Sequence, residues 1–279
     1  GRLTFTHTNM TDADLSGATL TADEDLKFRY ATMNDVDLSG AYFSSSDRIQ
    51  FTYTNMNDAD LSGATLTANE DLWFYRATMN DVDLSGASLT ANNNMWFYRA
   101  TMNDVDLSGA SLTANNNMRF YGAFMNDADL SGAYFDAGND IEFYGNDMTD
   151  ASLTSATLRA GADIAFNSAT ISNAGISGAY GAFMNDADLS GAYFDAGNNI
   201  QFSYADMTDA SLTSATLRAG RDIAFNSATI NNADISGAYF YAGAFIYFYR
   251  DGEGIFDVAD HDLNGTDFSG SSAVFGSCD

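Results

Sequence analysis

Large apolar residues recur along the chain with a fixed period of 23 positions. One leucine marks each period, and the series runs Leu15, Leu38, Leu61, Leu84, Leu107, Leu130 and Leu153. Inside a period the apolar anchors are spaced five, five, eight and five residues apart, as in Met10, Leu15, Leu20, Phe28 (with Leu26 beside it) and Met33. A unit this small does not bury its own apolar side and has to stack on its neighbours. The pattern therefore predicts a rod of short extended segments.

Small or apolar residues also precede the anchors by two positions, and in an extended chain these two side chains point the same way. Adjacent strands stack about 4.8 Å apart, so the inward residues should form columns. The first expected column is aromatic and consists of Phe28, Phe51, Phe74, Phe97, Phe120, Phe143 and Phe166. The column beside it consists of Leu26, Ile49, Leu72, Met95, Met118, Ile141 and Ile164. We expect both to be core.

The repeated five-residue motif resembles that of the pentapeptide-repeat family. Residues 13–17 and 187–191 both read Ala-Asp-Leu-Ser-Gly, and the resemblance extends over about residues 5–248. It implies an all-β, right-handed parallel β-helix, a four-sided solenoid here of about twelve coils. The chain departs from the family by three additional residues on one side of each coil, as in 21–25 and 90–94. These predict a bulged corner that repeats as a polar ridge.

The repeat loses its register in one place. Residues 121–179 and 180–238 are near copies offset by 59 positions, which is not a multiple of 23. We therefore expect a continuous solenoid over residues 1–250 with a phase slip near 176–184, followed at 251–279 by an irregular segment or a partial final coil. If the solenoid keeps winding through the slip, Phe202 and Phe225 should lie on the side opposite the phenylalanine column.

Composition excludes several classes of partner but does not by itself identify a function. The 279 residues carry a formal net charge of −27, with Lys27 and ten arginines as the cations. This charge repels phosphates, so neither nucleic acid nor an anionic membrane is an expected partner. No apolar run reaches the length of a membrane span. The scarcity of lysine favours an extracellular or cell-surface location.

Enzymatic chemistry is not expected. The two histidines, His7 and His261, lie near opposite ends of the chain, and Cys278 is the lone cysteine. These residues do not assemble into a cluster of nucleophile, base and acid. No glycine-rich loop is followed by the lysine that would bind a phosphate.

Acidic residues are arranged in columns. One column is Asp12, Asp35, Asp58, Asp81, Asp104 and Asp127, and the other is Asp14, Asp37, Asp60, Asp83, Asp106 and Asp129. Such neighbours repel one another. In one hypothesis each carboxylate accepts hydrogen bonds from backbone N–H groups of the turn. In the other, Ca²⁺ bridges a column or the corner formed by Asp23, Glu24 and Asp25, since calcium prefers oxygen ligands. No other cofactor is predicted.

The ends of the repeat suggest assembly. Phe5 and Met10 already occupy anchor positions, and an uncovered solenoid end invites another chain to continue the ladder. At the other end an aromatic cluster includes Phe240, Phe245, Phe248 and Tyr249, which either cap the rod or dock a neighbour; we favour docking. The main hypothesis is a structural, self-assembling extracellular fibre or sheath subunit, a head-to-tail homopolymer.

Two other functions compete with the fibre. The family resemblance implies an alternative, because some pentapeptide-repeat proteins are acidic rods that mimic DNA and bind a type II topoisomerase such as gyrase. A third hypothesis is ice binding, which uses flat rows of hydroxyls. The residues that would form such rows are Thr19 with Thr21, Thr65 with Thr67, Ser88 with Thr90 and Ser111 with Thr113.

Overall fold

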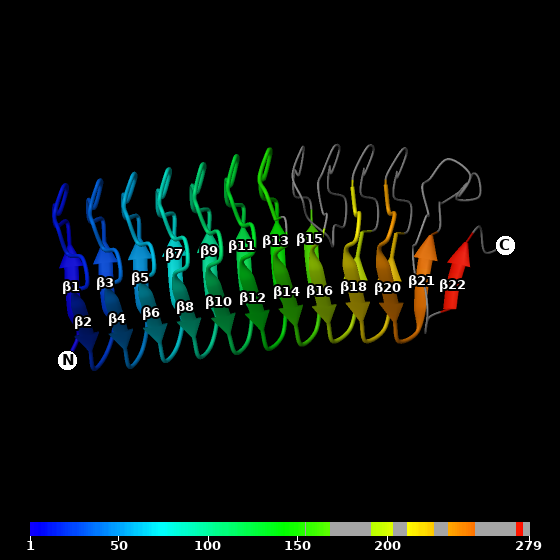
Figure 1. Ribbon diagram of the computed structural model, residues 1–279. Helices are drawn as coiled ribbons and strands as arrows, with labels where there is room; N and C mark the ends of the chain where they lie inside the picture. Colours follow the sequence, from blue (N-terminus) through cyan, green and yellow to red (C-terminus); the bar gives the residue numbers. More distant parts are fainter. Residues whose placement is uncertain (154, 168–190, 203–210, 226–233, 249–271, 276–279) are drawn as a thin grey trace.

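The computed structural model is an all-β rod in which every named strand pairs in parallel (Figure 1). It describes residues 1–279 except 154, 168–190, 203–210, 226–233, 249–271 and 276–279. The described residues contain no helix and make about nine turns of a parallel β-solenoid. None of them forms a helix long and apolar enough to cross a membrane.

The larger of the two sheets has 12 strands and extends along the whole rod. In spatial order its strands are β1 (Leu3–Thr6), β3 (Leu26–Arg29), β5 (Ile49–Thr52), β7 (Leu72–Tyr75), β9 (Met95–Tyr98), β11 (Met118–Tyr121), β13 (Ile141–Tyr144), β15 (Ile164–Asn167), β17 (Ile200–Gln201), β19 (Ile223–Ala224), β21 (Phe245–Phe248) and β22 (Ser272–Phe275).

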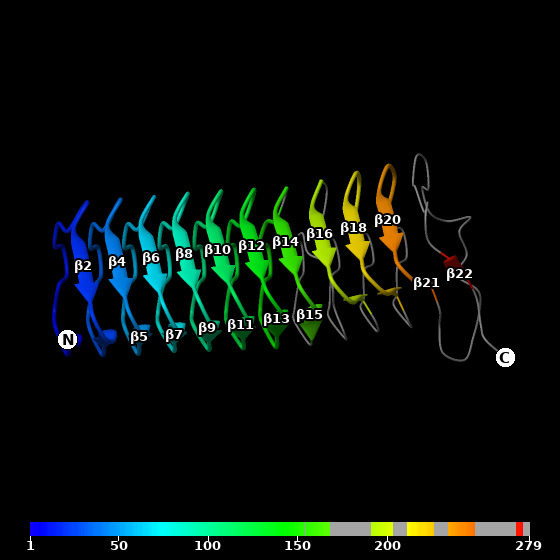
Figure 2. The same ribbon diagram turned by 90° about the horizontal axis from the view of Figure 1, so that it is seen from below.

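The second sheet has 10 strands and lies beside the first (Figure 2). In order its strands are β2 (Thr19–Ala22), β4 (Tyr42–Ser45), β6 (Thr65–Ala68), β8 (Ser88–Ala91), β10 (Ser111–Ala114), β12 (Tyr134–Ala137), β14 (Thr157–Ala160), β16 (Tyr193–Ala196), β18 (Thr216–Ala219) and β20 (Tyr239–Ala242).

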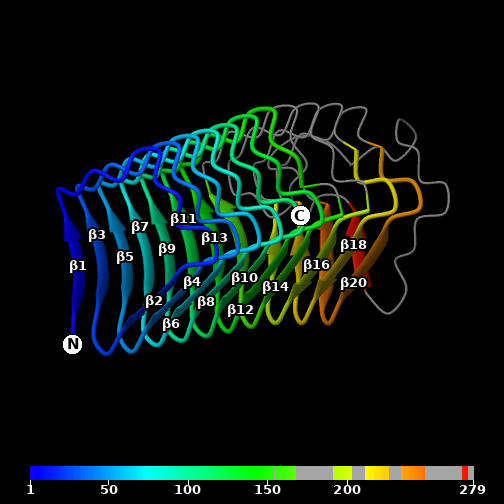
Figure 3. The ribbon, with the colours of Figure 1, turned by 60° about the vertical axis from the view of Figure 1, so that its left-hand side comes forward.

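Most turns stack on the next with a shift of 23 residues, as in the pairing of Leu3 with Leu26. The shift is 36 residues from β15 to β17 and 27 residues from β21 to β22. Between the two sheets the chain makes only single bridges, in one column that begins with Asn9 and Thr32 and another that begins with Asp14 and Asp37. The view toward the end of the rod shows the turns superposed (Figure 3). The predicted solenoid with a turn of 23 residues is confirmed.

Alternation of inward and outward side chains builds the core. In β5, β7 and β9 the first and third residues are buried and the second and fourth are half-exposed, as period-two geometry requires. Consecutive phenylalanine rings from Phe28 to Phe143 stack with centroids 4.6–4.9 Å apart. This offset geometry stabilises the column beyond its area burial. The predicted aromatic core is confirmed over these turns.

The three additional residues of each turn form the corner between the two sheets, where β2 ends at Ala22 and β3 begins at Leu26. From Gly138 onward the first corner residue is glycine, and successive glycines lie almost in contact. A Cβ atom on Gly161 would come within 1.9 Å of the carbonyl oxygen of Gly138, and one on Gly197 within 2.0 Å of that of Gly161. A Cβ atom on Gly138 would likewise come within 1.9 Å of the carbonyl oxygen of Asn115, so from Gly138 onward this position has no room for a side chain.

The predicted displacement of Phe202 and Phe225 is wrong. Ile164 of β15 pairs with Ile200 of β17, so both sheets continue straight. The shift there is 36 residues, which exceeds one turn by 13 (36 − 23 = 13), and the extra residues lie between β15 and β16. Stacked corners explain the result, because Gly161 lies against Gly197 on either side of the slip. The slip itself, near 176–184, lies outside the described residues.

The C-terminal segment contributes a strand to the solenoid. β22 pairs with β21, with Phe245 opposite Ser272 and Phe248 opposite Phe275. Part of the segment 251–279 therefore continues the larger sheet, although the rest of it lies outside the described residues apart from this strand.

The corner glycines provide a test of the fold. Replacing Gly161 by alanine should lower the free energy of unfolding by about 1–3 kcal/mol, the usual range for overpacking, since the new methyl group meets backbone that has no room to move. Urea denaturation measures this change. In the matched control, Ala162→Asn, the cost should stay below about 0.5 kcal/mol, because Asn116 and Asn139 occupy the equivalent corner position in the two preceding turns. Equal stability of the two variants would contradict the stacking argument.

Candidate functional site: an acidic strip and a corner network

Two carboxylates per turn project from the part of the coil that joins the two bridge columns. We call this surface the acidic strip; its members are Asp12, Asp14, Asp35, Asp37, Asp58, Asp60, Asp81, Asp83, Asp104, Asp106, Asp127 and Asp129. The Asp12 series is exposed and has φ between 52° and 58°. Aspartate and asparagine tolerate this left-handed conformation better than most residues, which explains why an acid stands at the bend.

The Asp14 series is held by its own turn. In each member the carboxylate accepts a hydrogen bond from the backbone N–H two residues later, at 3.1 Å from Ser16 and 2.8 Å from Ser62. The Ser16 hydroxyl donates to the same oxygen of Asp14 at 2.7 Å. These bonds from Ser16 lower the pKa of Asp14, the hydroxyl contributing most and the backbone N–H next. The hydrogen-bond hypothesis is confirmed for this column.

The negative charge of the acidic strip is not neutralised by basic residues in the same segments. No lysine or arginine occurs in residues 9–18 or in the five equivalent segments 32–41, 55–64, 78–87, 101–110 and 124–133. All ion pairs among the described residues lie elsewhere. The strip therefore presents negative charge at a fixed period.

The carboxylates of the described residues do not form a preformed calcium site. Within the described part of the chain, no three side chains among His, Cys, Asp and Glu converge on a common point. Calcium takes six to eight oxygen ligands, far more than one pair of carboxylates supplies. Bridging of the Asp12 column by Ca²⁺ stays a prediction.

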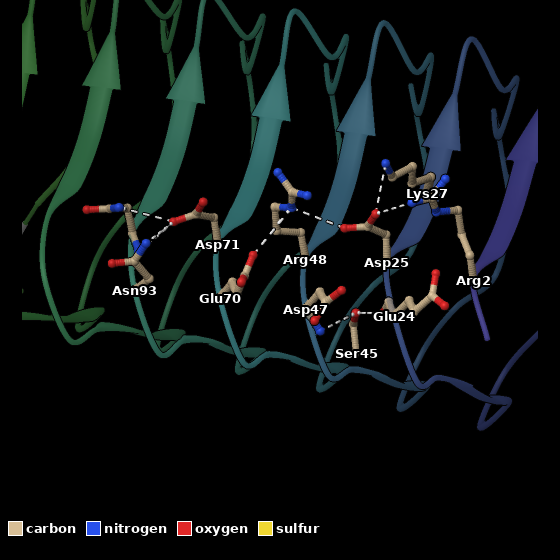
Figure 4. A network of polar contacts seen from close by, with 11 residues as sticks. Arg2, Glu24, Asp25, Lys27, Ser45, Asp47, Arg48, Glu70, Asp71 and Asn93 are labelled. Carbon is tan, nitrogen blue, oxygen red and sulfur yellow. Dashed lines mark hydrogen bonds and ion pairs between the residues drawn. The ribbon is translucent and has the colours of Figure 1, made fainter.

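The predicted acidic corner at Asp23, Glu24 and Asp25 is instead an ion-pair network (Figure 4). The side chain of Asp25 is only 2% exposed, and it meets Lys27 at 3.0 Å, Arg48 at 3.1 Å and Arg2 at 3.2 Å. Arg48 extends to Glu70 of the next turn at 3.5 Å. Three cations from the protein therefore surround the carboxylate that was assigned to a metal.

The two other predicted corner ligands do not join Asp25. The carboxylate of Asp23 is exposed and binds the N-terminal ammonium group of Gly1 at 2.6 Å. Glu24 is exposed, and its backbone carbonyl accepts a hydrogen bond from the Ser45 hydroxyl. The three side chains therefore do not converge on a common point, and calcium bridging at this corner stays a prediction.

Farther along the rod the same corner is held by side-chain amides. The oxygen of each third corner residue accepts a hydrogen bond from the backbone N–H of its successor, at 3.0–3.3 Å. The series is Asp71, Asn94, Asn117, Asp140, Asp163 and Asn199. Asn93 adds a bond to Asp71 at 2.9 Å. The triplets 92–94 and 115–117, both Asn-Asn-Asn, were the sequence signal for this ladder, and the sequence argument missed it.

The predicted assembly residues lie in unlike environments. Phe5 and Met10 are half-buried at the first turn, where β1 is the outermost strand of its sheet. Phe240 is fully buried, so it is not available to a docking partner. Phe245 is 42% exposed but belongs to β21, which β22 covers at the sheet edge. The side chain of Phe248 and all of Tyr249 lie outside the described residues. Of the described members, Phe240 and Phe245 do not share an exposed surface; docking through Phe248 and Tyr249 stays a prediction.

The rows expected for ice binding lie on the outer face of the smaller sheet. Tyr42 stands between Thr19 and Thr65 in the row and is 43% exposed. Its ring interrupts the flat hydroxyl array after the first turn.

Known proteins resemble the chain only in fold. No protein-family model and no curated protein matches the sequence. Among solved structures, a similar one is HetL, a pentapeptide-repeat protein involved in heterocyst differentiation regulation in the cyanobacterium Nostoc sp. strain PCC 7120. It is 22% identical, with 98% of this chain and 92% of HetL covered and a TM-score of 0.23. Another is QnrB1, a plasmid-mediated fluoroquinolone resistance protein, 15% identical over 88% of this chain and 90% of QnrB1, with a TM-score of 0.32. At these values we draw no functional inference from either similarity.

The corner network predicts a dependence of stability on pH. Burial raises the pKa of Asp25, but the hydrogen bond and charge of Lys27 and the charge of Arg48 lower it by more, so its pKa is depressed in the folded chain. Its contribution to stability is therefore complete above about pH 4, the unfolded value, and is lost as the pH falls through the folded pKa. Asp25→Asn should cost about 1–3 kcal/mol at neutral pH, a range kept low because its partners are partly exposed. The cost should shrink as the pH falls through the folded pKa of Asp25.

Unfolding measured from acid to neutral pH checks this expectation. The control is Asp35→Asn, which removes an exposed acid outside the network and should leave the acid-dependent loss of stability in place. A constant difference between Asp25→Asn and the original chain at every pH would contradict the ion-pair explanation.

Proposed function

We propose that the chain is a non-enzymatic binding rod whose acidic strip takes the place of DNA on a DNA-binding protein. The observation that carries the proposal is the strip itself, with two aspartates in each of the first six turns and no basic residue between them. The pentapeptide-repeat resemblance of the sequence motif suggests the class of partner, a type II topoisomerase such as gyrase.

The spacing of the charges supports the comparison with DNA. Turns stack about 4.8 Å apart, so two carboxylates per turn place about one negative charge on every 2.4 Å of the rod. Double-stranded DNA carries about one charge per 1.7 Å of its axis. A groove that has evolved to neutralise phosphates therefore meets a charge density of the same order on this rod. The net charge of −27 adds long-range attraction to a basic partner.

We also propose the shape, the handedness and the number of coils of the rod. The two sheets and the two bridge columns would be the four sides of a right-handed coil, and the whole chain would make about twelve coils. Right-handedness follows the strong preference of connections between parallel strands. A rod of this length offers the strip as one uninterrupted row over its first six turns.

Neutralising the exposed column tests the proposal. In a gyrase supercoiling assay the original chain should inhibit the enzyme, and a fourfold variant should need about a tenfold or higher concentration for the same inhibition, since each lost charge weakens attraction and specificity. Asparagine also suits the left-handed bend, so the fold should persist. The substitutions are Asp35→Asn, Asp58→Asn, Asp81→Asn and Asp104→Asn.

A matched control removes four acids from other surfaces. Inhibition should stay within about twofold of the original, because the strip is intact even though the net charge has changed equally. The control substitutions are Asp47→Asn, Asp136→Asn, Glu142→Gln and Asp195→Asn. Absence of any inhibition by the original chain, or equal loss in both fourfold variants, would overturn the strip as a DNA mimic.

End-to-end assembly into an extracellular fibre or sheath is a second proposal. It is favoured by the first turn, where β1 and β2 are the outermost strands of their sheets and where half-buried apolar side chains include Leu3, Phe5 and Met10. Outermost strands present unpaired backbone groups to another chain. Head-to-tail stacking that does not close generates a filament.

Electron microscopy of the 279-residue chain, with and without calcium, tests this assembly. Phe5→Glu should abolish filaments, because it places a charge against the apolar surface that the neighbour would cover. Thr4→Glu is the control, since Thr4 is exposed on the opposite side of the same strand and should leave filaments intact. Single short rods from the original chain under both conditions would refute the fibre.

A further inference from the structure

The outer face of the larger sheet carries a surface unlike the rest of the rod. In the turns around β7 and β9 its outward residues are aromatic or basic rather than acidic. We call this surface the aromatic-arginine face; its members are Trp73, Tyr75, Arg76, Trp96, Tyr98 and Arg99. All six are exposed or half-exposed.

Ring stacking fixes the positions of these side chains. Tyr75 and Tyr98 stack with centroids 5.1 Å apart, and Tyr98 continues to Tyr121 at 5.6 Å. The guanidinium of Arg76 lies 5.9 Å from the centre of the Tyr75 ring, and that of Arg99 lies 5.7 Å from the centre of the Tyr98 ring. A partner would therefore meet an ordered surface and would lose little side-chain entropy on binding.

Arg76 and Arg99 have no acidic partner among the described residues, and both are exposed. Two other arginines of the larger sheet region, in the turns before and after, are neutralised. Arg48 contacts Asp25 and Glu70, and Arg119 pairs with Glu142. The face thus offers two free positive charges one turn apart in a protein with a net charge of −27.

Its composition is that of a protein interface. Tryptophan, tyrosine and arginine are the residues enriched where binding energy concentrates. Because the charges are positive and repeat with the turn, the complementary surface needs carboxylates that repeat with the same spacing of about 4.8 Å. The acidic strip of this same chain has that spacing.

We propose that the aromatic-arginine face binds the acidic strip of a second copy of the chain, so that rods associate side by side with their axes aligned. Along one turn the chain passes from the larger sheet through the bridge column at Thr32 to the strip at Asp35 and Asp37, so the two surfaces lie on different sides of the rod. Each copy can therefore bind two neighbours through unlike surfaces. Such contacts do not close on themselves and give lateral arrays.

This association is separate from topoisomerase binding, although both use the acidic strip. Only the lateral contact requires Arg76 and Arg99. It also differs from end-to-end stacking, which uses the first turn and leaves the aromatic-arginine face free.

Sedimentation velocity of the full chain at about 0.15 M salt tests the proposal, since screening there suppresses distant repulsion and leaves close charge pairs in place. The original chain should form oligomers, and the variant Arg76→Gln with Arg99→Gln should weaken association about tenfold or more. The control variant is Arg159→Gln with Arg218→Gln, which changes two arginines on the smaller sheet and should associate like the original.

Mixing two variants separates lateral pairing from other association. The arginine variant keeps an intact strip, and the fourfold strip variant keeps an intact face. Neither should associate alone, while the mixture should form heterodimers and nothing larger. The arginine variant should still inhibit gyrase wherever the original does, so loss of one proposal leaves the other standing.

Three outcomes would overturn the lateral contact. One is an original chain that stays monomeric, and a second is association that persists in the arginine variant. The third is a mixture that forms no heterodimer although circular dichroism shows both variants folded.

Discussion

In-register parallel pairing of each residue with its counterpart in the next turn is the constraint on which the whole molecule depends. It extends beyond the two sheets, since at the tight bends Leu15 N–H donates to the Asp37 carbonyl at 2.7 Å and Gly17 N–H donates to the Ser39 carbonyl at 2.8 Å. The backbone is thereby satisfied at the corners as well as in the strands, which buried polar groups require. Each side chain is consequently held against a residue of the same position in the repeat, whatever that residue is.

Stacking like on like has opposite consequences for different side chains. Phenylalanine on phenylalanine gains burial and ring contact, and asparagine on asparagine gains a hydrogen bond because one amide both donates and accepts. Aspartate on aspartate gains no bond between the two side chains and adds repulsion, although the Asp140 carboxylate still accepts a hydrogen bond from the backbone N–H of Asp163. The exposed Asp12 series is consistent with this, because solvent and salt screen what the protein does not neutralise. Where a corner acid is buried, as at Asp25, the column is broken by the cation Arg48 one turn later.

The regular features could be predicted from the sequence because they depend only on the spacing of the repeat. The 23-residue turn, the Phe28 to Phe143 column and the turns of the Asp14 series all follow from spacing and residue type. The position of Phe202 did not, because two alternative windings satisfy the same apolar spacing, and the one observed keeps Gly197 stacked on Gly161 across the slip. The neutralisation of Asp25 could not be predicted from the local sequence, because its partners Arg2 and Arg48 come from the turns before and after it. The aromatic-arginine face was missed because alternate strand positions were read only for their inward members.

The distribution of cations gives the rod a second layer of organisation over its repeat. Lys27 and Arg48 are used to neutralise the corner acid, whereas Arg76 and Arg99 rest on tyrosine rings without an acidic partner among the described residues. A guanidinium that lies on an aromatic ring keeps its charge and its outward donors. Placing such groups on one side and unopposed carboxylates on another makes the rod electrically unlike on its two sides despite its repetitive backbone. Charge pattern, rather than any change of fold, is therefore the property through which this chain would select a partner.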